Sequence, residues 1–174
     1  MPTINPLRSS VIKTCLLLVI ALTSTSAFGQ ETTTYYLIRH AEKDLSDKSN
    51  RNPHLTEEGH NRAQAWSRIF KEVNFDMIYS TAYHRTLETA KPTAAFHNLE
   101  IREYNPRDLY NDAFKQTTQG KTVLIVGHSN TTPSFVNKIL GKENYPSIDE
   151  SIHGNLYIVS CVDDTISCQV LSIN

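Results

Sequence analysis

The sequence has little of what marks several common protein classes. Its 174 residues include only three cysteines, six glycines and one tryptophan, and they contain no repeat, low-complexity block or Gly/Ser linker. There is no basic run, and 17 basic against 18 acidic residues give a formal net charge of −1, so we expect no nucleic-acid partner. No apolar stretch approaches the about 20 residues that a membrane-spanning helix needs. These absences leave a single globular domain as the expectation.

The first 29 residues differ from the rest of the chain. A basic lead with Arg8 and Lys13 precedes an apolar stretch over Cys15 to Leu22, and a small, polar tail follows it. This three-part pattern is typical of a secretory signal peptide. Ala27 and Gly29 favour cleavage after Gly29, while cleavage after Ala27 stays open. We therefore expect a signal peptide over residues 1–29, one domain over 30–174, a periplasmic or secreted location, and no stable membrane anchor after cleavage.

Removal of the leader takes Cys15 with it and leaves Cys161 and Cys168 in an oxidising compartment. The sequence permits a disulfide between them and equally permits two separate thiols, because it does not define their geometry. The oligomeric state is open as well.

Strand and helix patterns alternate along the remaining chain. Strands are expected over 33–39, 75–79, 99–104 and 122–126, with a closing hairpin over 156–161 and 165–173. Helices are expected from Thr56 as N-cap to 71, from Ser80 or Thr81 as N-cap to 97 with a kink or break at Pro92, over 108–118, and from Thr132 as N-cap to Gly141. This order predicts an α/β fold of three layers, α/β/α, with a mostly parallel central sheet and a C-terminal hairpin.

Two predicted strands end in titratable residues. The first strand runs into Arg39-His40, and the apolar run 122–126 runs into Gly127-His128. Ligands of parallel sheets bind beyond the carboxyl ends of the strands. If these two strands are neighbours, both histidines meet in one crevice.

Four motifs carry a family resemblance: Leu37-Ile38-Arg39-His40-Ala41-Glu42, Leu55-Thr56-Glu57-Glu58-Gly59, the segment 80–90 around His84-Arg85-Thr86, and Val126-Gly127-His128-Ser129. Each is weak alone. In this order and spacing, they resemble the small branch of the histidine phosphatase superfamily, which includes phosphoglycerate mutases and short phosphohistidine phosphatases. The resemblance spans residues 35–141 and implies a phosphoglycerate mutase-like fold.

The resemblance implies a role for each motif residue. His40 is the expected nucleophile and forms a phosphohistidine intermediate, with one ring nitrogen held by a backbone carbonyl. Arg39 and Arg85 would clamp the phosphoryl oxygens, and His128 would donate to the same oxygens. Thr86, Asn130 and backbone amides after Gly127 are further candidate donors. Two guanidinium groups and an imidazole supply the charge, so the scheme needs no metal or other cofactor.

The candidate general acid departs from the family pattern. Glu103, in Arg102-Glu103, stands where many members carry the proton donor, but Tyr104-Asn105-Pro106 follows instead of the usual glycine-rich continuation. Asp108 or no carboxylate at all are the alternatives. The implied partner is a phosphorylated small molecule or phosphoprotein, with hydrolysis favoured over mutase activity because the chain lacks the insertions that enclose a bisphosphate.

Two other interpretations stay open. Gly127-His128-Ser129 also resembles the nucleophile turn of a serine hydrolase, with Ser129 as nucleophile and Asp149 and His153 as its partners. A phosphate-binding module without turnover is the third possibility. The remaining histidines are expected to be structural or solvated: His54, His60, His84, His97 and His153.

Overall fold

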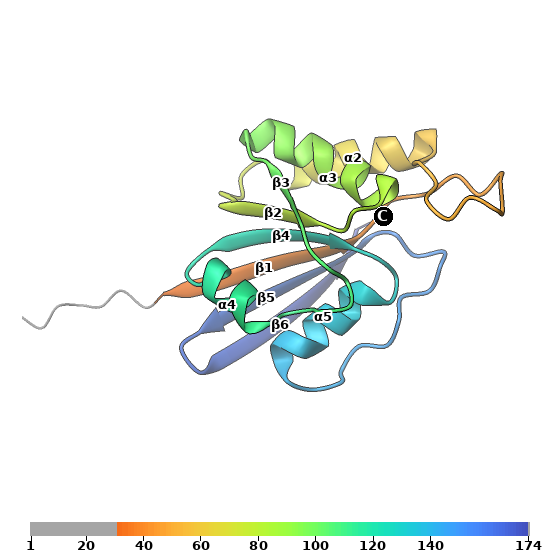
Figure 1. Ribbon diagram of the computed structural model, residues 1–174. Coiled ribbons are helices and arrows are strands. Elements are labelled where there is room, and N and C mark those ends of the chain that lie inside the picture. Colours follow the sequence, from red (N-terminus) through yellow and green to blue (C-terminus); the bar gives the residue numbers. More distant parts are fainter. Residues whose placement is uncertain (1–30, 174) are drawn as a thin grey trace, which may run out of the picture. The chain divides into compact units, whose positions relative to one another are not determined.

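A computed structural model describes residues 31–173, so the predicted signal peptide over 1–29 lies outside the described residues. One six-stranded sheet has the order β3-β2-β4-β1-β5-β6 (Figure 1). Strands β1, β4, β2 and β3 are parallel, whereas β5 runs antiparallel to β1 and pairs with β6 as a hairpin. The strands are β1 (Thr32–Arg39), β2 (Met77–Ser80), β3 (Ile101–Glu103), β4 (Thr122–Gly127), β5 (Asn155–Val162) and β6 (Thr165–Ser172).

Four helices connect the strands: α2 (Glu57–Ile69), α3 (His84–His97), α4 (Asp112–Thr118) and α5 (Thr131–Leu140). Thr56 caps α2 as predicted, because its hydroxyl accepts from the amide of Gly59 at 3.0 Å. Gly141 ends α5 in the left-handed conformation, also as predicted.

The predicted N-caps of α3 and α5 were wrong, and α3 does not break at Pro92. Helix α3 starts after Tyr83, because Ser80 is still in β2 and the Thr81 hydroxyl is engaged with other side chains. Pro92 lies inside α3 without ending it. The N-cap of α5 is Asn130, two residues before Thr132. At Thr81 and Thr132, hydrogen bonds to His128 and to the Ile38 carbonyl outweigh the local capping preference.

The helices cover both faces of the sheet, which confirms the predicted three-layer fold. Figure 1 shows α2 and α3 on one face and α4 and α5 on the other. Strand β4 alternates between the two cores: Val123 and Ile125 pack toward α5, and Leu124 and Val126 pack toward α2 and α3. This explains why its sequence is a continuous apolar run.

The C-terminal hairpin leaves the two cysteines as separate thiols. Cys161 lies opposite Ile166, and Cys168 lies opposite Val159. Burial raises the pKa of both thiols. In the part of the chain that the structure describes, no helix is long and apolar enough to cross a membrane.

Candidate functional site

Strands β1 and β4 are neighbours, so the condition for a shared crevice is met. Their register places Arg39 opposite Gly127, and the amide of His40 donates to the Gly127 carbonyl at 2.9 Å. The rings of His40 and His128 lie 5.4 Å apart, edge to face. A Cβ atom at Gly127 would lie 2.7 Å from the Thr132 hydroxyl, so glycine is needed at this crowded turn.

The His40 ring is held in one tautomer. Its Nδ1 lies 2.7 Å from the carbonyl of Ala41, and a carbonyl can only accept, so Nδ1 carries the proton. Nε2 then keeps its lone pair. Burial lowers the pKa of His40 to about 2, and the cationic neighbours Arg85 and Arg39 reinforce this, against a weaker rise from the Ala41 bond. The imidazole is therefore neutral, as a nucleophile must be.

The His128 ring is held through its Nε2 atom. Its Nε2 lies 2.9 Å from the Thr81 hydroxyl, which itself lies 2.9 Å from the Thr86 hydroxyl. Burial lowers the pKa of His128 to about 4, with Arg85 and Lys43 acting in the same direction. Because Thr81 engages Nε2, Nδ1 is the ring nitrogen left for a ligand.

Arg85 is the group most clearly short of a partner. Among residues 31–173, its Nε and Nη1 are buried without a hydrogen-bond acceptor. The guanidinium lies 4.4 Å from the centre of the Tyr83 ring. Burial lowers its pKa, but a guanidinium remains charged. Buried N–H donors without an acceptor are costly, so this guanidinium favours an anion nearby.

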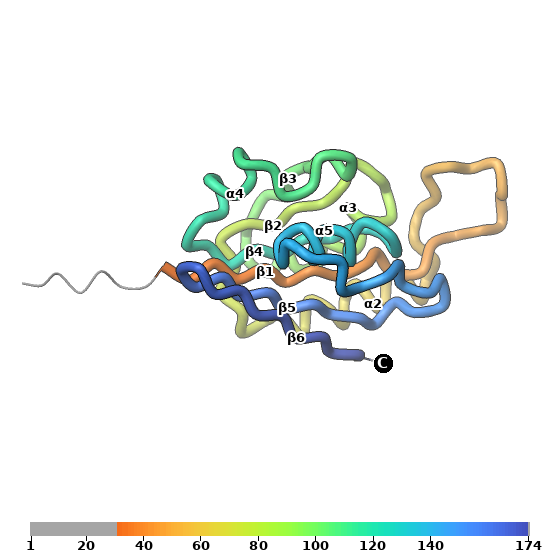
Figure 2. Tube along the Cα trace, turned by 90° about the horizontal axis from the view of Figure 1, so that it is seen from below, coloured from red at the N-terminus to blue at the C-terminus, as the bar shows by residue number. Residues whose placement is uncertain are grey.

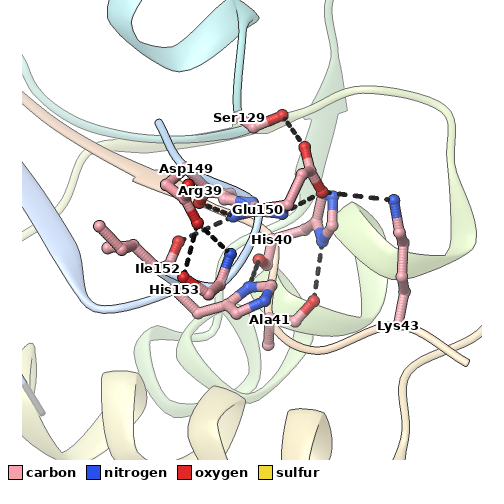
Figure 3. A network of polar contacts seen from close by, with 10 residues as sticks. Arg39, His40, Ala41, Lys43, Ser129, Asp149, Glu150, Ile152 and His153 are labelled. Carbon is pink, nitrogen blue, oxygen red and sulfur yellow. Dashed lines mark hydrogen bonds and ion pairs between the residues drawn. The ribbon is translucent and has the colours of Figure 1, made fainter. Parts of the chain in front are cut away.

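Arg39 already holds an anion. Its side chain is only 1% exposed, its Nη1 donates to the carbonyls of Asp149 and Ile152 at 2.8 Å, and its Nη2 donates to the Glu150 carboxylate at 2.6 Å. Ser129 donates to the other Glu150 oxygen at 2.6 Å (Figure 3). The segment between α5 and β5 thus presents a carboxylate to the arginine that was expected to clamp phosphate.

Lys43 also faces this carboxylate, with its Nζ 3.8 Å from Glu150 (Figure 3). The hydrogen bond from Ser129 lowers the pKa of Glu150, and the charges of Arg39 and Lys43 lower it further, against the opposing effect of burial. Glu150 is thus a bound anion rather than a proton donor in this state.

A cavity of about 380 Å³ opens over the two histidines. It includes the predicted residues His40, Arg85, His128 and Asn130, but Arg39, which is buried and bonded to Glu150, does not line it. Sequence reasoning missed several lining residues: Lys43, Tyr83, Pro106, Arg107 and Thr131. Lys43 and Arg107 stand in segments without regular pattern, where only proximity in sequence to a motif could have drawn attention to them.

The two candidate acids lie elsewhere. Glu103 lines neighbouring hollows with Tyr104 and Asn105, and Asp108 accepts from the Asn111 amide at 2.8 Å in one of them. Of the described residues that line the His40 cavity, none carries a carboxylate. The structure does not bring Glu103 to His40, so its role as general acid stays a prediction without geometric support.

The serine hydrolase triad is not assembled. Ser129 donates to Glu150, whereas His153 donates its Nδ1 proton to the carbonyl of His40 at 3.0 Å. The Asp149 carboxylate accepts from the amide and hydroxyl of Ser151. The three side chains have separate partners, which contradicts this alternative.

The motif at 55–59 has a structural role. The amide of Thr56 donates to the Glu42 carbonyl at 2.9 Å, and a Cβ at Gly59 would lie 2.2 Å from the same oxygen. Glu42 itself pairs with Arg62 at 2.7 Å. Close packing at Gly59 therefore fixes the segment that follows His40.

Fold and pocket together define a phosphoglycerate mutase-like α/β protein whose pocket, lined by histidine and arginine side chains, lies at the carboxyl ends of two adjacent strands. The family model described as histidine phosphatase superfamily (branch 1) matches residues 35–105. This match confirms the resemblance to the superfamily that the motifs predicted. The matched range includes His40 and Arg85, whereas His128 lies beyond it.

Solved structures with the same fold include YhfR from Bacillus stearothermophilus, with 17% identity and a TM-score of 0.62 over 82% of this chain and 98% of that one. A phosphoserine phosphatase from Entamoeba histolytica, solved as a variant with phosphoserine, has 16% identity and a TM-score of 0.60 over 79% and 95%. A phosphoglycerate mutase from Bacillus anthracis has 13% identity and a TM-score of 0.59 over 83% and 93%. A comparison with curated proteins gave no match.

Proposed function

We propose that this protein is a metal-independent phosphatase that hydrolyses a phosphomonoester or phosphoramidate through a phosphohistidine intermediate on His40. One observation carries the proposal: a neutral imidazole with its Nε2 lone pair free lies in a cavity with the unpartnered N–H groups of Arg85. Nucleophile and anion site are the two elements that in-line phosphoryl transfer requires.

Hydrolysis takes two displacements. Nε2 of His40 attacks phosphorus while the bond to the leaving oxygen or nitrogen breaks, and the leaving group takes a proton from solvent. Nδ1 keeps its proton and its bond to Ala41, which spreads the new positive charge of the ring. Water then attacks the phosphoryl group, the P–N bond breaks, inorganic phosphate and a proton leave, and neutral His40 returns.

Charge on the phosphoryl oxygens is met by Arg85 and by His128, whose Nδ1 is left for a ligand. Arg39 joins them once the substrate phosphate displaces the Glu150 carboxylate from its Nη2. A dianionic phosphoryl group competes well for this position because it carries more charge than a carboxylate. Glu150 thus marks where a phosphoryl oxygen is expected to bind.

The leaving group decides the substrate class. No carboxylate lines the His40 cavity among the described residues, so protonation of a poor alkoxide leaving group has no evident donor. A phosphoramidate, such as phosphohistidine on a protein, or a monoester with a good leaving group requires least help. Lys43 and Arg107 at the cavity favour an anionic substrate.

A hydrolysis panel tests the activity. The protein is incubated with a phosphoramidate, an aryl phosphate and an alkyl phosphate, each with and without EDTA. We expect the phosphoramidate and the aryl phosphate to be hydrolysed faster than the alkyl phosphate, and EDTA to leave all three rates unchanged. The activity should be lost in His40→Ala and retained in Ser129→Ala. Loss in Ser129→Ala with activity kept in His40→Ala would instead identify an enzyme with a serine nucleophile.

A phosphate-binding module without turnover is the second candidate, favoured by the same missing acid. Tight binding of phosphate or orthovanadate, with no hydrolysis of any member of the panel, would support it. Because binding and turnover are measured on the same preparation, the two functions are separated directly.

Export belongs to the proposal too. The pattern of residues 1–29 supports a cleaved signal peptide and a periplasmic or secreted enzyme. Mass spectrometry of the protein purified from cell fractions should find a chain that begins near Gln30 outside the cytoplasm. A full-length chain retained in the cytoplasm would contradict export without affecting the catalytic proposal.

A further inference from the structure

Three side chains outside the His40 cavity converge where the segment before α2 meets the start of α3. His54, His84 and Glu88 each place one potential ligand atom within 4.8 Å of the others. The structure assigns to them a binding site for a late first-row divalent cation, with Zn²⁺ as the best match. Neither the family resemblance nor the phosphatase proposal requires this site.

The carboxylate is prepared for a metal. One Glu88 oxygen accepts from the amide of Leu55 at 2.9 Å, and the other faces Nδ1 of His54. The Leu55 amide orients this carboxylate as outer-shell donors orient metal ligands.

The two imidazoles complete a set of two histidines and one carboxylate. Their rings are stacked, with centres 4.2 Å apart and an angle of 14° between the planes. The His84 amide donates to the side chain of Asn52 at 2.9 Å, which ties its backbone to the same segment. Such a set leaves a fourth position for water, and imidazole nitrogen favours Zn²⁺, Cu²⁺ or Ni²⁺ over Mg²⁺ or Ca²⁺.

Binding requires a small closure of the cluster. Metal–nitrogen bonds of about 2.0 Å place tetrahedral ligand atoms roughly 3.3 Å apart, so the spread of 4.8 Å must shrink. Both histidines are exposed, and their rings can turn between rotamers without disturbing the core. The metal would replace the contact between His54 and Glu88 by two coordination bonds.

The position gives the cation a structural consequence. Figure 2 shows the segment after β1 extending away from the sheet before it returns to α2, and His54 lies at the end of that return. His84 stands between Tyr83 and Arg85, which line the His40 cavity. A bound cation therefore cross-links this segment to the backbone that carries Arg85, without contact with the reacting phosphoryl group.

Metal titration of the full chain in phosphate-free buffer tests the site. Zn²⁺ binding is followed by calorimetry and Co²⁺ binding by visible absorption, which is intense for four-coordinate cobalt. We expect one equivalent to bind, and His54→Ala and His84→Ala each to weaken binding by at least about tenfold. Zn²⁺ should raise Tm in the original protein but not in His84→Ala.

One histidine variant serves as a control. His40→Ala removes an imidazole of the cavity and leaves the three proposed ligands in place, so it should keep the original affinity. Absence of saturable binding at one equivalent would overturn the assignment and leave only an ion pair between His54 and Glu88. Loss of binding in His40→Ala, or unchanged binding in His84→Ala, would overturn it too. None of these readouts depends on phosphatase activity.

Discussion

The two sides of the cavity differ in how the chain builds them. On the side of the proposed nucleophile, called the nucleophile side below, His40 and His128 follow two central strands that are buried on both faces and paired in parallel register. On the leaving-group side, the chain continues from β3, an edge strand of three residues whose Arg102 and Glu103 are exposed. Sheet register fixes the first side closely, whereas local turns and side-chain contacts determine the second.

Removal of the nucleophile should give the largest effect. His40→Ala deletes the Nε2 lone pair, so hydrolysis should fall by about three orders of magnitude or more. Initial rates with an aryl phosphate measure it, and His60→Ala provides an exposed-histidine control that keeps full activity. Comparable rates in both variants would contradict the assignment of His40 as the nucleophile.

Arg85→Ala should rank second. It removes the buried guanidinium whose N–H groups lack an acceptor, so kcat/KM should fall by about 10²- to 10³-fold. Arg85→Lys should recover part of the loss, because lysine keeps the charge but not the fork of donors. Arg107→Ala, a matched loss of charge on the other side of the cavity, should cost less. Equal losses would remove the distinction between the two sides.

Much of the nucleophile side was predictable from sequence because it depends on patterns that the sheet enforces. The apolar run into Gly127-His128 and the end of β1 at Arg39-His40 indicate adjacent buried strands, and the parallel sheet follows from the order of elements. The four motifs then implied the fold and the superfamily.

The remainder depends on tertiary contacts. Glu150 reaches Arg39 from a segment without regular pattern, and its effect arises only because Ser129 and Lys43 surround the same carboxylate. Similarly, Thr81 was expected to cap α3, but its hydroxyl binds His128. His54 and His84 resembled solvated histidines because 30 positions separate them in the chain. No local sequence pattern predicts such contacts between residues that are distant in the chain.

Acid should destabilise the fold through the nucleophile side. The pKa of His40 is lowered to about 2 and that of His128 to about 4, below the usual 6.5, so the unfolded state binds these protons first. This stability is complete above about pH 6.5 and is lost as the pH falls toward the folded-state values. The free energy of unfolding should decrease by at most about 1.4 kcal/mol per pH unit for each histidine.

Urea titrations between pH 7 and 5 should show this decrease. In His128→Gln, the free energy of unfolding should fall less steeply with decreasing pH. An unchanged slope in that variant would contradict burial of the neutral ring.

Glu150→Gln should improve substrate binding, by a smaller factor than the losses expected for His40→Ala and Arg85→Ala. The amide keeps the size of the side chain but removes the charge that competes with phosphate for Arg39, so KM should fall by about threefold to tenfold. Glu143→Gln changes another acidic residue of the same connecting segment and should leave KM unchanged. A rise in KM for Glu150→Gln would indicate that this carboxylate helps to bind substrate.

Glu103→Gln should have the smallest effect. Because Glu103 lines a hollow beside the His40 cavity, kcat for a phosphoramidate should change by less than about twofold. The same comparison with an alkyl phosphate sharpens the test, since that leaving group depends most on a proton donor. A large loss confined to the alkyl substrate would place Glu103 at the leaving group during turnover.

Identification of the phosphorylated atom tests the central claim most directly. The protein is mixed with a labelled phosphate donor, quenched in alkali within the first turnover, digested and mapped by mass spectrometry. The account predicts one alkali-stable, acid-labile phosphoryl group on Nε2 of His40, absent from His40→Ala. Label on Ser129, or rapid turnover with no label on His40, would contradict it.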